Sequence, residues 1–213
     1  MICCYISSVS AQDWPNLHRY ADSNTKLMSE PVPKDRVVFI GNSITDSWIK
    51  FSPEFFAEHH YVDRGISGQT SPQMLLRFRA DVINLRPRAV VIECGTNDIA
   101  GNTGPSTLEM VEDNIMSMVE LAKANKIRVI IGSVPPSTQF GWAKDVEPAD
   151  KIVALNDWLK AYAKRKHIRY VDYYSSLVND QKDMKPEYSP DHVHPNKAGY
   201  AVMEQLVQEA IRK

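Results

Sequence analysis

Short apolar runs alternate with longer amphipathic stretches along this chain. The runs are rich in β-branched and aromatic residues, as strands are. In the longer stretches apolar residues recur at spacings of three and four, which is typical of a helix with one buried face. The pattern predicts strands at residues 36–40, 61–63, 89–92, 128–131 and 169–171. It predicts helices near 17–21, after Ser43, at 54–59, from Ser71 until Pro87 stops it, at 107–122, at 149–166 and at the carboxyl end.

The alternation of strands and helices predicts one sheet of mostly parallel strands. Right-handed crossovers place helices on both faces of such a sheet, so we expect a three-layer α/β/α fold. The run at 89–92 is apolar throughout, as expected of a parallel strand covered on both faces. We expect about five strands in the flavodoxin-like order 2-1-3-4-5, in which the loops after the first three strands meet at the edge that holds a ligand.

The helical spacing also predicts which residues are buried. In the helix after Ser43, the residues Ile44, Trp48 and Phe51 fall on one face and should pack against the sheet. Trp48 is aromatic enough to line a pocket, but its place in this stripe favours the core. In the helix from Ser71 the predicted buried residues are Met74, Leu75, Phe78, Val82 and Leu85.

Length and composition predict a single domain over residues 13–213. With 213 residues, 43% of them hydrophobic, the chain is long enough for one good core and short for two. The formal charge of −1, without a basic run carrying interleaved aromatic residues, argues against nucleic acid as a partner. No apolar run in the sequence approaches the roughly 20 residues of a membrane span. The sequence predicts no particular oligomeric state.

Residues 1–12 have the features of a leader. Small residues precede Gln12, as at the end of a secretory signal, but the segment lacks a basic start and is short for a whole signal. We expect the remnant of an export signal and hence a periplasmic or secreted protein; the alternative is a structureless leader on a cytoplasmic protein. The cysteines Cys3, Cys4 and Cys94 cannot form a paired framework, and Cys94 should be a small buried residue.

One serine lies at the predicted turn between the first strand and the helix that follows it. In Gly41-Asn42-Ser43-Ile44, the serine follows the strand by two positions and begins the helix. The free backbone N–H groups of a helix start stabilise negative charge that forms beside them. Ser43 is therefore a candidate nucleophile. The alternative is that Ser43 only caps the helix, since serine is among the best N-cap residues.

Other predicted loops hold the groups that a serine nucleophile needs. Acyl transfer requires a base, a group that orients the base, and donors that face the oxyanion. Asp191 and His194, three residues apart before the last helix, are the candidates for orienting group and base. Gly68 and Asn97, in the loops after the second and third strands, would offer a backbone N–H and a side-chain amide to the oxyanion, beside the N–H of Ser43. Alternatively, Asp191 and His194 only cap the last helix.

Four segments together resemble the motif blocks of the SGNH/GDSL hydrolase family, in the family's order. They are Gly41-Asn42-Ser43-Ile44, Gly65-Ile66-Ser67-Gly68-Gln69-Thr70, Gly95-Thr96-Asn97-Asp98 and Asp191-His192-Val193-His194-Pro195. Each block is weak alone, whereas four in order, in a match over residues 36–212, are specific. The resemblance implies a Ser43 nucleophile, a His194 base oriented by Asp191, and an oxyanion hole from Ser43, Gly68 and Asn97. Within the family the chain is most similar to the short-chain, acetylesterase-like branch.

Asn42 departs from the family, whose members usually carry aspartate at this position. Because the neutral amide still forms local hydrogen bonds, we expect an altered rate or pH dependence and no loss of function. The chain has no Gly-x-Ser-x-Gly elbow, which argues against the α/β-hydrolase fold.

A few other residues are candidates for binding a substrate or a metal. Asn42 and Trp142 are candidates for contact with substrate; a place in the core is an equal alternative for Trp142, which lies in a proline-flanked loop long enough to reach over the sheet edge. His192 should face solvent. Adjacent side chains such as those of His59 and His60 diverge, so we predict no metal site.

From these residues we expect a serine esterase that cleaves short-chain esters, foremost acetyl esters of carbohydrates, through an acyl-enzyme and without a cofactor. The expected partner is a small acyl ester or acetylated saccharide. Short loops leave little material for a lid or a lipid groove, which ranks acetyl above long acyl groups. The alternatives are a thioesterase or lysophospholipase-type acylhydrolase with the same machinery, and a non-catalytic glycan-binding module on the same scaffold.

Overall fold

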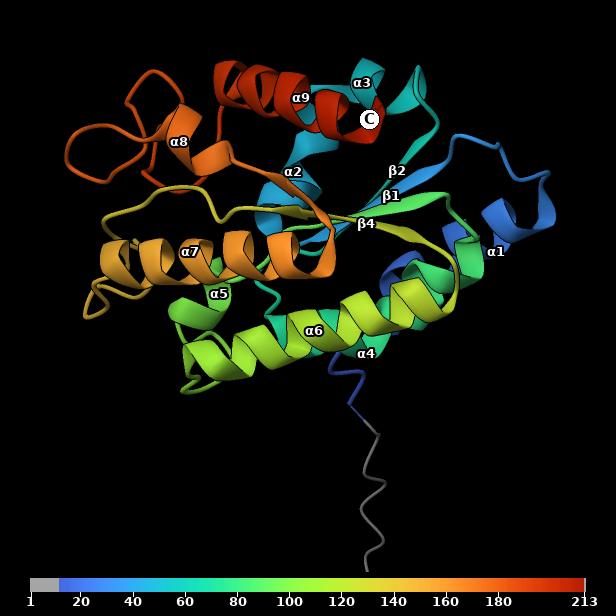
Figure 1. Cartoon of the computed structure of the whole chain (residues 1–213), viewed down its shortest axis with the longest axis horizontal. Helices are drawn as coiled ribbons and strands as arrows, with labels where there is room; N and C mark the ends of the chain where they lie inside the picture. Colours follow the sequence, from blue (N-terminus) through green and yellow to red (C-terminus); the bar gives the residue numbers. More distant parts are fainter. Residues whose placement is uncertain (1–11, 213) are drawn as a thin grey trace, which may run out of the picture.

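A single parallel sheet runs through the centre of the computed structural model, which describes residues 12–212 (Figure 1). Its strands are β1 (Val37–Gly41), β2 (Tyr61–Gly65), β3 (Ala89–Ile92), β4 (Arg128–Gly132) and β5 (Arg169–Val171). They are arranged in the order β2-β1-β3-β4-β5, and every neighbouring pair is parallel. The predicted fold class and strand order are therefore confirmed.

Helices cover both faces of the sheet and complete the three layers seen in Figure 1. One face packs on α4 (Ser71–Asp81), α6 (Leu108–Ala124) and α7 (Ala149–Lys166). The other face packs on α2 (Ser43–Phe51), α3 (Pro53–Ala57), α8 (Tyr173–Leu177) and α9 (Lys197–Arg212). The remaining elements are η1 (Leu17–Tyr20), α1 (Ala21–Ser29), η2 (Ile83–Leu85) and α5 (Thr96–Ile99).

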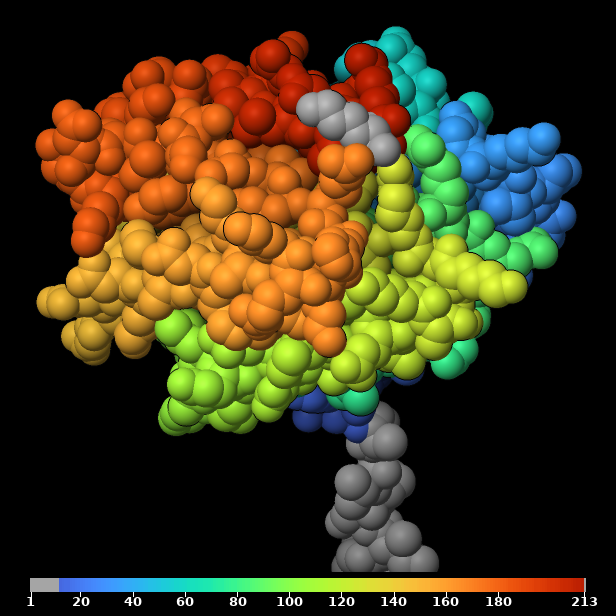
Figure 2. Space-filling view, in the orientation of Figure 1, coloured from blue at the N-terminus to red at the C-terminus, as the bar shows by residue number. Residues whose placement is uncertain are grey.

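Alternation along the strands gives the sheet its two apolar faces. Val38 and Ile40 of β1 belong to the cluster on the side of α4, α6 and α7, whereas Val37 and Phe39 belong to the cluster on the side of α2 and α9. The central strands β1 and β3 are thus buried on both faces, as parallel strands in the middle of a sheet are. In space-filling form, side chains of α6 and α7 close the space that separates the ribbons in this view (Figure 2).

Two details of the predicted core are wrong. Phe51, at the end of α2, is 43% exposed, because the helix ends there and the chain turns away through Ser52 into α3. The helix from Ser71 ends at Asp81, so Val82 and Leu85 are buried outside it, on the short helix η2 and the residue before it. The left-handed conformation of Arg86 then stops η2 just before Pro87.

The leader proposed for residues 1–12 falls, except for Gln12, outside the described residues. Within the described part of the chain, no helix combines the length and the apolar character that a membrane span requires.

Candidate active site

The turn between β1 and α2 places Ser43 at the carboxyl edge of the sheet. A Cβ atom at Gly41 would lie 2.0 Å from the Thr45 hydroxyl oxygen, so only glycine lets the first turn of α2 pack directly on the end of β1. Asn42 caps the helix, because its side-chain oxygen accepts a hydrogen bond from the amide of Ile44 at 2.9 Å. Asn42 is therefore the N-cap of α2, and the hydroxyl of Ser43 is free for other partners.

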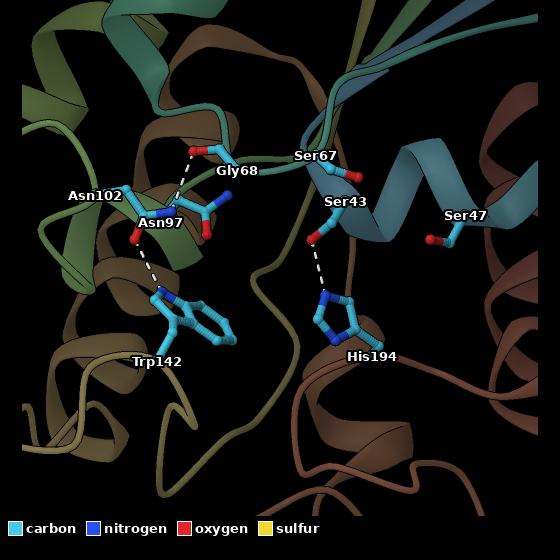
Figure 3. A pocket seen from close by; sticks show the side chains of 8 residues that line it. All are labelled: Ser43, Ser47, Ser67, Gly68, Asn97, Asn102, Trp142 and His194. Carbon is cyan, nitrogen blue, oxygen red and sulfur yellow. Dashed lines mark hydrogen bonds between the residues drawn. The ribbon is translucent and has the colours of Figure 1, made fainter.

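Ser43, His194 and Asp191 form one chain of hydrogen bonds. The Ser43 hydroxyl lies 2.9 Å from Nε2 of His194, and a dashed line in Figure 3 marks this hydrogen bond. Nδ1 of the same ring lies 2.7 Å from a carboxylate oxygen of Asp191. A proton on Nδ1, donated to Asp191, leaves Nε2 to accept the serine proton. The structure thus brings together the three side chains that the sequence singled out, from positions 151 residues apart.

The loop before α9 holds Asp191 and His194 by hydrogen bonds of its own. Asp191 accepts from the backbone amides of Val193 at 3.0 Å and of His194 at 2.8 Å. The cap of α9 is supplied by Asn196, whose side-chain oxygen accepts from the amides of Ala198 and Gly199. Asp191 and His194 are therefore not the caps of the last helix.

The charge of Asp191 is stabilised by its partners. Partial burial acts to raise the pKa of this carboxyl, but the hydrogen bonds from the His194 amide and ring and from the Val193 amide outweigh it and lower the pKa below the ordinary value. The carboxylate is thus ionised wherever the imidazole works as a base, and it favours the positive ring that forms when His194 takes a proton.

Gly68 and Asn97 face the same cavity from the other side. Gly68 has φ +81°, a left-handed conformation that glycine adopts without strain, and it lies in the loop between β2 and α4. Asn97 belongs to α5, directly beyond β3, and is 2% exposed. Its side-chain nitrogen donates to the carbonyl of Gln69 at 3.0 Å, which fixes the amide in place and leaves a second N–H for a ligand.

The cavity has a volume of about 470 Å³, within the range of small-molecule sites. Ser43 and His194 stand on one side of it, and the Asn97 amide and Gly68 on the other (Figure 3). Its walls are formed by Ser43, Ser47, Ser67, Gly68, Asn97, Asn102, Trp142 and His194.

Trp142 forms one wall of this cavity and is held there by specific contacts. Its indole N–H donates to the side chain of Asn102 at 2.9 Å, and Asn102 in turn donates to the carbonyl of Gly68 at 3.1 Å. One face of the indole stacks on Phe140, with ring centroids 5.2 Å apart. The ring lies 6.3 Å from the His194 ring and is 47% exposed, so it belongs to the site and not to the core.

Asn42 does not reach the cavity. It is 1% exposed and lies beneath the turn, where its oxygen caps α2 and its side-chain nitrogen has no hydrogen-bond partner among the described residues. The expectation that Asn42 contacts substrate therefore disagrees with its buried position. Asn42 stabilises the turn between β1 and α2 instead.

The other residues weighed for binding take structural places. The side chains of His59 and His60 diverge, toward the carbonyl of Phe55 and the carboxylate of Asp35, and no group of His, Cys, Asp and Glu suited to a metal occurs within residues 12–212. Trp48 and Cys94 are both 2% exposed. His192 is half-exposed, but its ring also contacts the carboxylate of Asp183.

Several wall residues were missed from the sequence. Asn102 lies in a polar loop in which no spacing separates it from its neighbours, and Ser47 and Ser67 are ordinary polar residues in pattern terms. The only signal for Ser47 is its spacing of four from Ser43, which places both on one face of α2.

Comparison with known proteins assigns the family. A model of the GDSL-like lipase/acylhydrolase family matches residues 39–202. The chain belongs to this family. Two solved structures are alike over nearly their whole length: a Bacteroides fragilis protein is 51% identical with a TM-score of 0.91, over 94% of this chain and 98% of the other. A GDSL-like lipase from Bacteroides thetaiotaomicron is 48% identical with a TM-score of 0.89, over 93% and 98%.

A curated relative is more distant. An acetylxylan esterase of Xylanibacter ruminicola is 25% identical over 90% of this chain. The chain spans about half the length of that relative, with a match over 46% of it. The family resemblance inferred from the four motif blocks is thereby confirmed.

Proposed function

We propose that this GDSL protein hydrolyses short-chain carboxylic esters, foremost acetyl esters of carbohydrates, through an acyl-enzyme on Ser43. The observation that carries the proposal is the hydrogen-bonded chain Ser43–His194–Asp191, which opens into a cavity whose far side holds Gly68 and Asn97.

The geometry fits a two-step acyl transfer. Nε2 of His194 takes the hydroxyl proton of Ser43 while the oxygen attacks the ester carbonyl. The backbone N–H groups of Ser43 and Gly68 and the side-chain N–H of Asn97 face the oxyanion of the tetrahedral intermediate. The imidazolium then gives its proton to the leaving alcohol oxygen, and the acyl group remains on Ser43.

In the second step a water molecule takes the place of the alcohol. The water oxygen attacks the acyl carbon while His194 accepts one proton of the water. His194 then returns a proton to the Ser43 oxygen as the carboxylic acid leaves. Asp191 stays ionised throughout and stabilises the imidazolium in both steps. No cofactor is needed for this chemistry.

The cavity walls favour a small acyl group. Ser47, Ser67 and Asn97 are short or polar, and Trp142 is the one large apolar side chain among the eight described residues that line it. A long acyl chain needs a continuous apolar surface, which these walls do not offer. The name of the Xylanibacter ruminicola relative, an acetylxylan esterase, supports acetate on a carbohydrate.

The alternative of a thioesterase or lysophospholipase is less well supported. Their leaving groups carry phosphates, which proteins commonly bind with arginine and lysine. Among the described residues that line the cavity, neither occurs.

Release of acetate from 4-nitrophenyl acetate tests the reaction, with Ser43→Ala as the matched variant. We expect turnover by the wild type and near-background rates for the variant at an unchanged unfolding midpoint. Equal, slow rates for both proteins would contradict the proposal. Saturable glycan binding by a protein that never turns over would instead support the glycan-binding module on this scaffold.

The acyl preference needs a separate comparison. Rates on acetyl, butyryl and octanoyl esters of the same alcohol should fall with chain length. A maximum at octanoyl would favour the lipid-type alternative. Export of the protein is a further proposal, which rests on the small residues before Gln12 and is checked by fractionating cells that express the full-length protein.

A further inference from the structure

A second cavity, of about 570 Å³, adjoins the one that holds Ser43. The two share four wall residues, namely Ser67, Gly68, Asn102 and Trp142. The second cavity therefore begins on the other side of the loop that carries the oxyanion-hole glycine. A ligand that lies over Trp142 can occupy both.

The outer wall of the second cavity comes from the segment before β1. Gln12, Asp13, Trp14, Asn16 and His18 line it, and all of them precede the stretch matched by the family model. Gln69 and Gln73 tie this segment down, because their side-chain nitrogens donate to the carbonyls of Pro15 and Trp14, each at 2.8 Å. The backbone of the segment is thus held at two points, by a residue just before α4 and by a residue in the first turn of α4.

Trp14 keeps a large apolar surface exposed despite this anchoring. Its side chain is 40% exposed at the second cavity, and Trp142 is 47% exposed where the two cavities meet. Tryptophan offers a broad rigid face at a low cost in conformational entropy, which suits ligand binding. Two exposed tryptophans on one continuous groove are more than the scattered apolar residues of an ordinary surface.

The polar residues of the second cavity are mostly neutral. Asn16, Gln73, Asn102 and Thr103 carry amide and hydroxyl groups, whereas the buried amide of Gln69 is bonded to Pro15 and Arg77. Asp13 and His18 are paired with each other at 2.6 Å. No arginine or lysine lines either cavity among the described residues, so a phosphate-bearing leaving group finds no cation there. Apolar faces with neutral hydrogen-bonding groups between them match a sugar, whose rings have apolar faces and hydroxyl edges.

The position of His194 fixes which part of the ester faces the groove. The leaving alcohol must lie at Nε2 to receive its proton, and the His194 ring lies 6.3 Å from Trp142. The alcohol therefore emerges at Trp142, from which the groove continues to Trp14, while the small acyl group stays beside Ser47.

We propose that the groove from Trp142 to Trp14 binds an oligosaccharide alcohol, so that the enzyme prefers acetylated oligosaccharides to acetylated monosaccharides. This inference rests on the proposed function. Trp142 holds the sugar ring that carries the ester, and Trp14, from the segment outside the family match, holds a ring further along the saccharide.

Acetylated xylose and acetylated xylotetraose, with 4-nitrophenyl acetate as a reference, test the proposal. We expect kcat/KM to be higher for the tetrasaccharide than for the monosaccharide. Trp14→Ala should lower kcat/KM about tenfold on the tetrasaccharide and leave it unchanged on 4-nitrophenyl acetate, a loss typical of one exposed anchor residue. Trp14→Phe should recover most of it. Leu76→Ala, a matched loss of an exposed apolar side chain outside both cavities, should change neither rate.

Equal losses on both esters, or none on the tetrasaccharide, would overturn the proposal while leaving ester hydrolysis intact. A second measurement does not depend on turnover. Calorimetry should show unmodified xylotetraose binding to Ser43→Ala, and Trp14→Ala in that background should weaken it. Binding without any Ser43-dependent hydrolysis would contradict the proposed function and not the groove. Stronger inhibition of the wild type by coenzyme A than by xylotetraose would contradict the saccharide assignment.

Discussion

The two sides of the cavity are built in different ways. Ser43 and Asn97 lie on α2 and α5, the helices that follow β1 and β3, and their neighbourhood is packed, with Asn42 and Asn97 at most 2% exposed. Asp191 and His194 lie in a loop without regular structure, and the Asp191 side chain is 49% exposed. Packing positions the strand side, whereas local hydrogen bonds position the loop side. Changes to the buried, hydrogen-bonded residues of the strand side, such as Asn97, should therefore cost stability as well as rate, and changes in the loop should cost rate alone.

Two carboxyl groups show the same contrast. Glu93, just beyond β3, is 4% exposed, and neither of its oxygens has a hydrogen-bond partner among the described residues. Burial, with a smaller contribution from the charge of Asp98, raises the pKa of Glu93 to about 8. Asp191, which accepts several hydrogen bonds, has a lowered pKa. The surroundings keep one carboxyl neutral near pH 7 and the other charged.

His194→Ala should give the largest effect, because it removes the base from the loop side. We expect kcat for 4-nitrophenyl acetate to fall by about 10⁴-fold or more, with the unfolding midpoint unchanged. In the double variant with Ser43→Ala the rate should fall no further, since the two side chains act as one unit. Losses that multiply would show that His194 works independently of Ser43.

Asn97→Ala should give the next largest effect and should act on both rate and stability. Loss of one oxyanion donor lowers kcat by about 10²–10³-fold. Loss of the hydrogen bond to Gln69 costs about 1 kcal/mol of unfolding free energy. Steady-state kinetics and urea unfolding check the two parts. Asn102→Ala, which removes a wall residue without an oxyanion donor, is the control and should keep most of kcat. A kcat for Asn97→Ala close to that of this control would remove Asn97 from the oxyanion hole.

Glu93→Gln should stabilise the protein in a pH-dependent way. The folded pKa of about 8 lies above the ordinary value of 4.5, so between these values the unfolded chain loses a proton that the folded protein keeps. Wild-type stability therefore falls relative to the variant as pH rises through this window, and the difference levels off above it. Urea unfolding at pH 5 and pH 8 should show a gain for Glu93→Gln that grows by more than about 1 kcal/mol. A gain that is the same at both pH values would contradict the raised pKa.

His192→Ala should give the smallest effect. His192 contacts Asp183, and Asp183 also accepts from the amide of Thr138 at 3.1 Å, so this pair links the loop of Asp191 to the segment that carries Trp142. We expect kcat/KM to fall a few-fold, with the unfolding midpoint little changed because His192 itself is half-exposed and Asp183 keeps its bond from Thr138. Asp180→Ala, an exposed acidic residue of the same region, is the control for charge and should have no effect. A loss as large as that of His194→Ala would mean that His192 takes part in the chemistry.

Periodicity and motif order were enough to predict the strand order and the edge of the sheet that holds the site. Strand order follows from alternation and crossover handedness, and the edge that holds Ser43, Gly68 and Asn97 follows from strand order. The exposure of Phe51 was missed because spacing shows which face of a helix is apolar but not how far the sheet and α9 cover its last turn. The place of Trp14 beside the cavities was missed because its segment has no periodicity, and tertiary contacts from Gln69 and Gln73 hold the segment there.

The role of Ser43 as nucleophile is tested most directly by trapping the acyl-enzyme. The wild type is mixed with 4-nitrophenyl acetate, quenched in acid during turnover and digested, and the peptide that contains Ser43 is analysed by mass spectrometry. We predict an acetyl group on Ser43 of the wild type and none in Ser43→Ala. In His194→Ala the ratio of acetylated enzyme to turnover rate should be higher than in the wild type. Undiminished turnover by Ser43→Ala, or acetylation of another residue with Ser43 unmodified, would contradict the account.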